Sequence, residues 1–294
     1  DKGKELDWFA SGEIVAYAVV AAVSFAVFLV WELTDKHPVV DLTLFQRRNV
    51  WAGAVALSVA YGVFFGNVVL LPLWLQQYMG YTATQAGMVL APVGLMALVL
   101  SPVVGKSIGK VDPRYFATFA FLVFALVLWM RSHFNTQADI ATIMVPTIIQ
   151  DVKMAFFFIP LVTIILSGLP PERIPAASGL SNFTRITAGA VGTSVATTLW
   201  ESRAAMHHAH LVESITLGNP IASGALSGLA SSGINAEQAL AQVNRMVDQQ
   251  AFMLAANDIF YMSAALFLLL IPLIWMTQPP KASMGNADAA AGAH

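Results

Sequence analysis

Charged side chains that interrupt long apolar stretches are the residues of this chain best placed to do chemistry. A charge inside a bilayer costs about 2.5–3.5 kcal/mol on insertion scales, so such a side chain is expected to face a protein interior or a wet cavity. Three residues are candidates for handling charge: Asp151, Lys153 and Arg185. Asp151 or Lys153 could carry a proton or a cation, or could form a structural ion pair with a neighbouring helix. Arg185 could face the interior, or its long side chain could reach the membrane surface.

Aromatic and neutral polar side chains beside helix-breaking residues form a second group of candidates. Pro72 lies in one apolar stretch, and Pro146 and Pro160 lie in another. Interrupted helices at corresponding positions mark the binding region of transporters built from inverted repeats, although proline is common in membrane helices generally. We therefore expect two interrupted helices beside a mostly apolar cavity with a few polar anchors. The candidate substrate-binding residues are Tyr61, Phe65, Asn67, Gln150, Phe157 and Asn182.

Three neighbouring histidines raise the question of a metal site. His207 and His210 share one face of a predicted helix, with His208 between them. Only Glu213 accompanies them, and the H-E-x-x-H pattern is absent. The sequence therefore favours exposed histidines over a metal site. Because the G-x-S-x-G and G-x-x-x-x-G-K-[ST] motifs are also absent, we expect neither an enzyme nor a bound cofactor.

Membrane-spanning helices must position these candidates. The 294 residues are 57% hydrophobic and 11% charged, whereas a typical soluble domain has about 25% charged residues. The net charge of −2 offers no basic face for nucleic acid. A helix of about 20 apolar residues crosses a bilayer core. The sequence thus predicts an all-α membrane protein with seven transmembrane helices, at residues 14–31, 50–75, 86–105, 115–130, 140–166, 175–200 and 251–276.

Two local patterns predict how these helices pack. Ala188, Gly192 and Ala196 recur every four residues, and such a small-residue stripe lets another helix approach closely. Arg131 follows the fourth stretch directly, and we expect its side chain to reach the membrane interface.

The long loop at residues 201–250 is expected to contain two helices. The first covers residues 201–214. The second begins after Asn235, which forms a capping box with Gln238 three residues later, and it could continue into the last span. Between them, residues 218–233 are rich in Gly, Ser and Ala, and we expect this stretch to be flexible.

Lysine and arginine counts in the loops predict the orientation of the chain. One side of the membrane holds eight basic residues, and the short loops of the other side hold only Arg131. The basic side should be cytoplasmic, which places residue 1 in the periplasm and the C-terminus in the cytoplasm. Because the start has no signal-peptide pattern, we expect the chain to be a piece of a longer protein. The eight residues are Lys36, Arg47, Arg48, Lys106, Lys110, Arg114, Arg173 and Lys281.

Several short motifs resemble one family of transporters. They are VDLTLF at 40–45, LSGLPPER at 166–173, SNFTR at 181–185 and MHHA at 206–209. Together they are similar to the fourteen-helix drug:proton antiporters of the major facilitator superfamily, EmrB-like members in particular, and the resemblance runs over nearly the whole chain.

The resemblance implies a fold and a division of the chain. Residues 1–48 would hold one extra central transmembrane helix and a cytoplasmic linker. Residues 49–280 would form the C-terminal six-helix bundle of a major facilitator transporter, with the periplasmic loop at 201–250. Residues 281–294 read as a disordered tail.

The resemblance also implies a function and partners. Such proteins lie in the bacterial inner membrane and export hydrophobic, drug-like toxic compounds against proton entry by alternating access. The partners would be protons, the N-terminal half of the same transporter, a periplasmic adaptor (EmrA-like) and an outer-membrane channel (TolC-like). The usual coupling acid of the family lies in the N-terminal half, so none is assigned here. The alternative is a non-transporting membrane scaffold or partner subunit.

Overall fold

The computed structural model describes residues 8–35, 41–91, 95–108, 110–216, 218–231, 233 and 235–279. Within these ranges the side chains of residues 8, 95–97, 108, 151–155, 221 and 230 are not described. The candidate charge-handling side chains of Asp151 and Lys153 therefore lie outside the described residues.

The described residues form helices and no strand, and the predicted all-α membrane fold is confirmed. Within the described ranges, four helices are long and apolar enough to cross a membrane, namely α1, α2, α5 and α9. Helix is present at every one of the predicted apolar stretches. The helices are α1 (Gly12–Thr34), α2 (Arg48–Gln77), α3 (Ala83–Leu90), α4 (Leu95–Ile108), α5 (Pro113–Arg131), α6 (Ile140–Leu166), α7 (Ile174–Glu213), α8 (Pro220–Ser231) and α9 (Ala236–Trp275), with short 3-10 helices at Trp8–Ala10, Leu42–Gln46 and Pro171–Arg173.

The expectation of two interrupted helices is wrong. Helix α2 continues through Pro72, and α6 continues through Pro146 and Pro160. Proline removes one backbone hydrogen bond, and membrane helices tolerate this loss because neighbouring groups satisfy the freed carbonyl. In the third stretch α3 ends at Leu90 and α4 is described from Leu95.

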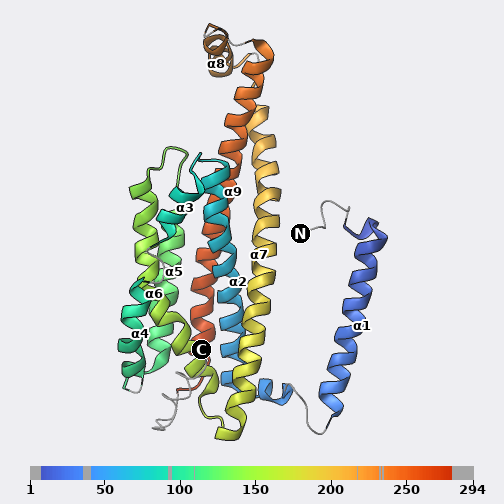
Figure 1. The fold of residues 1–294 in the computed structure, drawn as a ribbon, viewed down its shortest axis with the longest axis vertical. Helices are drawn as coiled ribbons and strands as arrows, with labels where there is room; N and C mark the ends of the chain where they lie inside the picture. The colour runs from blue at the N-terminus through green and yellow to red at the C-terminus, as the bar shows by residue number, and fades with distance from the viewer. Residues whose placement is uncertain are drawn as a thin grey trace.

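A bundle of packed helices stands beside one separate helix (Figure 1). Within the bundle α2 packs on α7, α5 packs on α6 and α9, and α7 packs on α9. Helix α1 lies to one side, and none of its most apolar window is buried. An apolar helix with so much exposed surface needs lipid or another protein segment to cover it.

Helices α7 and α9 rise together beyond the rest of the bundle and carry α8 at their tip (Figure 1). We call this the distal end, and the opposite end, where α2 begins and α9 ends, the basal end. The capping box of Asn235 and Gln238 is confirmed, and α9 runs from it into the last span without a break. The helix expected over 201–214 is a continuation of α7. The stretch expected to be flexible is instead helical over Pro220–Ser231. Its proline occupies the first position of the helix, where the missing backbone N–H costs no hydrogen bond.

The predicted small-residue stripe is confirmed, and it lies against glycines of α2. A Cβ built on Gly192 would lie 2.2 Å from the carbonyl oxygen of Gly62, and one built on Gly66 would lie 2.7 Å from the Cβ of Ala196. The two backbones thus approach more closely than any side chain larger than hydrogen would allow at these positions. We call Gly62, Gly66 and Gly192 the glycine seam.

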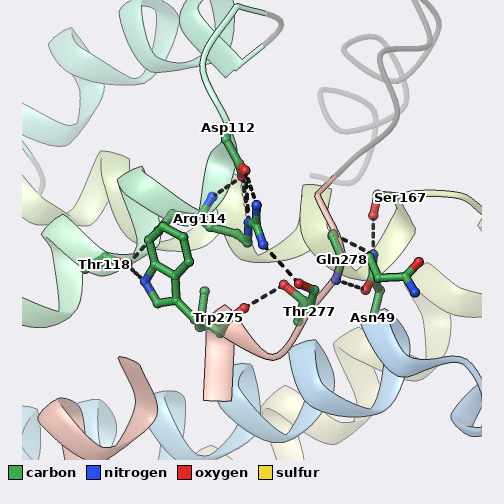
Figure 2. A network of polar contacts seen from close by, with 9 residues as sticks. Asn49, Asp112, Arg114, Thr118, Ser167, Trp275, Thr277 and Gln278 are labelled. Carbon is green, nitrogen blue, oxygen red and sulfur yellow. Dashed lines mark hydrogen bonds and ion pairs between the residues drawn. The ribbon is translucent and has the colours of Figure 1, made fainter. Parts of the chain in front are cut away.

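Polar contacts at the basal end tie the ends of several helices together (Figure 2). The Asn49 side-chain amide, at the start of α2, donates to the hydroxyl of Ser167 at 2.8 Å and to the carbonyl of Gln278 at 3.1 Å. The backbone N–H of Gln278 donates in return to the side-chain oxygen Oδ1 of Asn49 at 2.7 Å. One side chain therefore joins α2 to the segments that follow α6 and α9.

A second set of contacts in Figure 2 adds α5 to this junction. Arg114 pairs with Asp112 at 2.6 Å, and its Nη1 donates to the carbonyl of Thr277 at 3.1 Å. Its guanidinium also lies over the ring of Trp275, whose indole N–H donates to the hydroxyl of Thr118 at 3.1 Å. Burial on its own raises the pKa of Asp112, but the hydrogen bonds and positive charge of Arg114 outweigh it and hold that pKa below its ordinary value.

Replacing Gly192 with alanine is expected to force α2 and α7 apart, because the new methyl group would overlap the backbone of Gly62. Overpacking of this kind lowers the free energy of unfolding by about 1–3 kcal/mol. The melting temperature of the purified protein should fall. The matched control is Gly179→Ala on the same helix, where no heavy atom lies within 4 Å of the built Cβ. Equal melting temperatures for the two variants would contradict the close contact.

The depressed pKa of Asp112 predicts a pH-dependent contribution to stability. A carboxyl whose folded pKa lies below its unfolded value stabilises the fold above that unfolded value, about 3.9, and the contribution disappears as the pH falls through the folded pKa. Asp112→Asn should therefore lower the melting temperature at pH 7, and the difference from the unmodified protein should shrink towards pH 3. Glu237→Gln, at an exposed carboxylate of α9, is the control. A difference that stays constant with pH would show that Asp112 acts without its charge.

Candidate functional site

Arg185 is the centre of a cluster that joins α2, α6 and α7. Its guanidinium carbon lies 5.0 Å from the ring centre of Tyr61 and 4.6 Å from that of Phe158. Nη1 donates to the Tyr61 hydroxyl at 3.1 Å, and Nη2 donates to the side-chain oxygen of Asn182. Within the described part of the chain these partners are all neutral, and no ion pair to Arg185 is found. Among the described residues, the positive charge of Arg185 therefore meets only ring faces and neutral oxygen atoms.

Stacked aromatic rings form the wall on which Arg185 lies. The Tyr61 ring stacks on Phe157 of α6 with centroids 5.4 Å apart, and it lies 5.7 Å from the ring of Phe65, one helical turn later on α2. Phe157 is fully buried. Behind it, the ring of Phe124 of α5 lies edge-on at 5.1 Å. Because the rings support one another across three helices, the position of Tyr61 is well fixed.

The Arg185 side chain lines two cavities, and both are lined mainly by apolar atoms. The larger, of about 380 Å³, lies between α2 and α7, and the smaller, of about 220 Å³, lies between α2, α6 and α7. The larger is lined by Tyr61, Phe65, Arg185, Ile186, Gly189, Ala190 and Thr193. The smaller is lined by Leu57, Phe158, Val162, Ser178, Gly179, Ser181, Asn182 and Arg185. The larger volume lies within the range of about 300–1,000 Å³ that is usual for small-molecule sites, and the smaller lies below it.

The structure brings together some of the predicted residues and separates others. Tyr61, Phe65, Asn182 and Arg185 line the two cavities, and Phe157 supports Tyr61 from behind. Asn67 and Gln150 lie elsewhere, in an interior pocket of about 10 Å³ between α2, α5, α6 and α9.

That interior pocket holds a further residue, Arg131. We expected this side chain at the membrane interface, and that expectation is wrong, because only 2% of it is exposed. Its Nη2 donates to the hydroxyl of Thr147 at 3.3 Å. The sequence did contain a signal for a polar interior at this point, because Thr147 and Gln150 lie three residues apart and so share one face of α6. A pocket of this size has room for about one water molecule and none for an organic compound.

The expectation for the three histidines is only partly met. His210 is exposed, but His207 and His208 are half-buried and contact acidic side chains of α9. Among the described residues, no group of three or more His, Cys, Asp or Glu side chains could hold a metal ion.

Comparison with known proteins supplies a family context for this geometry. The family model described as Major Facilitator Superfamily matches residues 8–193. The chain is 46% identical over its whole length to the multidrug export protein EmrB of Escherichia coli (strain K12), and 44% identical over 97% of its length to the fatty acid resistance protein FarB of Neisseria gonorrhoeae. It is 42% identical over 95% of its length to EmrB of Haemophilus influenzae. The chain spans 57%, 56% and 55% of the lengths of these three relatives.

Proposed function

Because this chain belongs to the Major Facilitator Superfamily, we propose that it forms part of a proton-driven multidrug efflux transporter. In this proposal the cavities around Arg185 hold the exported compound. The observation that carries the proposal is a positive charge without an acidic partner among the described residues, set between aromatic rings at a cavity of about 380 Å³. The identity of 46% to a protein named for multidrug export supports it.

The chemistry of the cavities favours hydrophobic compounds that carry a negative charge. Tyr61 and Phe65 present ring faces on which flat or apolar molecules can stack. A guanidinium whose described partners are neutral can form charge-assisted hydrogen bonds to a carboxylate or a similar anion. A relative that is 44% identical is named for fatty acid resistance, and a fatty acid combines these two features.

The transport cycle in this proposal needs a second bundle. The chain spans little more than half of its relatives' length, and we place it as the C-terminal half. The bundle would rock against the N-terminal half of the same transporter, so that the cavities open alternately to the two sides of the membrane. By the family resemblance, the usual proton-coupling acid would lie in that other half.

The proposed location is the bacterial inner membrane, with the basal end in the cytoplasm. Arg47, Arg48, Arg114 and Arg173 lie at the basal end, and an excess of basic residues marks the cytoplasmic side. The distal hairpin of α7, α8 and α9 would then extend into the periplasm, where an EmrA-like adaptor and a TolC-like channel could be met. A scaffold without transport, the alternative, would have no use for a cavity-lining charge that has no acidic partner among the described residues.

Arg185→Gln tests the proposed binding role. It removes the charge and keeps a polar side chain, so resistance to long-chain fatty acids should fall on the order of tenfold, the effect of losing one charge-assisted hydrogen bond. Resistance to a neutral hydrophobic compound should change much less. The measurement is growth inhibition of an efflux-deficient strain that expresses the full-length protein, with abundance checked by immunoblot.

The control for this test is Arg245→Gln, at an exposed arginine of α9 far along the chain from the cavities. It removes the same charge and should leave all resistance unchanged. Unchanged fatty acid resistance in Arg185→Gln would remove Arg185 from the binding site. An equal loss for every compound at normal abundance would assign it a structural role instead.

A further inference from the structure

A separate cavity of about 430 Å³ lies near the distal end of the bundle, between α5, α7 and α9. None of its lining residues takes part in the cavities around Arg185. It combines a carboxylate, a guanidinium, a histidine, a side-chain amide and two large aromatic rings. These side chains belong to Asp258, Arg203, His133, Asn257, Trp129 and Tyr261.

The charged groups of this cavity are only partly engaged. The Asp258 Oδ2 atom lies 2.8 Å from the Nε2 atom of His207 and 3.5 Å from the Nη1 atom of Arg203. In the described part of the chain, no hydrogen bond reaches the other carboxylate oxygen. Arg203 likewise uses one of its five N–H donors there. The cavity therefore offers an acceptor and several donors side by side.

The aromatic residues of this cavity are of the types that favour the boundary between lipid and water. Trp129 and Tyr261 are 52% and 62% exposed, and these two residue types are enriched at that boundary. Trp129 lies two residues before the end of α5, and Arg203 lies three residues beyond the predicted sixth span. A ligand here would have its polar part beside Asp258 and its apolar part in the membrane.

We propose that this cavity binds the headgroup of a phospholipid that carries a primary ammonium group, as phosphatidylethanolamine does. The guanidinium of Arg203 suits the phosphate, and the free oxygen of Asp258 suits the ammonium. The acyl chains would lie against Trp129 and Tyr261. A headgroup with a phosphate but no ammonium would bind less well, because it brings a negative charge to the second carboxylate oxygen of Asp258 and offers that oxygen no donor.

Helix α9, which carries Asp258, also supplies a matched control for this site. His208 lies 3.4 Å from Asp248, a contact of the same kind as that between His207 and Asp258. Neither His208 nor Asp248 lines the cavity. Substitution of Asp248 therefore removes a similar histidine–aspartate contact without touching the proposed lipid site.

Native mass spectrometry of the purified, delipidated protein tests the proposal. The probes are phosphatidylethanolamine, phosphatidylglycerol, which lacks the ammonium, and phosphatidylcholine, whose methylated ammonium cannot donate a hydrogen bond. The unmodified protein should retain phosphatidylethanolamine best. Asp258→Asn should lower its apparent affinity on the order of tenfold and spare phosphatidylglycerol. Arg203→Gln should weaken all three lipids, and Asp248→Asn should change none.

Three results would overturn the proposal. The first is equal retention of the three lipids by the unmodified protein, a comparison that stands even where a variant fails to fold. The second is an equal effect of Asp258→Asn and Asp248→Asn in variants with normal melting temperatures. The third is binding of soluble glycerophosphoethanolamine as tightly as the lipid, which would identify a site for a free headgroup compound rather than for a membrane lipid.

Discussion

The close contact of α2 with α7 is the constraint on which the rest of this structure depends. At the glycine seam the two backbones touch, because Gly62 and Gly192 have no side chains to hold them apart. The same contact brings Arg185 of α7 within hydrogen-bond distance of Tyr61 of α2. It also lays the Phe65 ring against Gly189, whose built Cβ would lie 3.3 Å from that ring. A wider spacing of these helices would separate the cation from its aromatic partners and merge the cavities with open space.

The main chemical feature of the site between α2, α6 and α7 is the Arg185 cation, whose described partners are neutral groups. Tyr61, Phe158 and Asn182 stabilise the Arg185 guanidinium through ring faces and oxygen atoms, and none of the three cancels its charge. Cation–π contacts are worth about 0.5–2 kcal/mol, which offsets part of the desolvation of the guanidinium. Such an arrangement holds the side chain in place and leaves its charge available to a ligand. At the distal cavity, in contrast, Arg203 shares its charge with Asp258, and the two sites therefore suit different ligands.

Much of the fold could be predicted from sequence, because it rests on local patterns. Length and hydropathy locate the membrane helices, small residues four apart locate the seam, and the Asn235 capping box locates the start of α9. The predictions that failed concern features set by contacts between distant segments. Proline inside an apolar stretch predicts a helix break, but α2 and α6 continue through their prolines. Asn67 and Gln150 were placed with Tyr61, yet the rotation of their helices turns them into the interior beside Arg131. The hydrophobic periodicity of one segment does not show which neighbouring helix that segment contacts.

Cysteine labelling tests the central claim, that the cavity between α2 and α7 binds the exported compound. The chain has no cysteine, so Ala190→Cys places a single thiol of this chain on the cavity wall. Ala241→Cys places one on the exposed distal part of α9 as a control. With the protein in detergent, a fatty acid should slow the reaction of a maleimide with Ala190→Cys several-fold and leave Ala241→Cys unaffected. Equal rates at Ala190→Cys with and without the fatty acid would contradict the account.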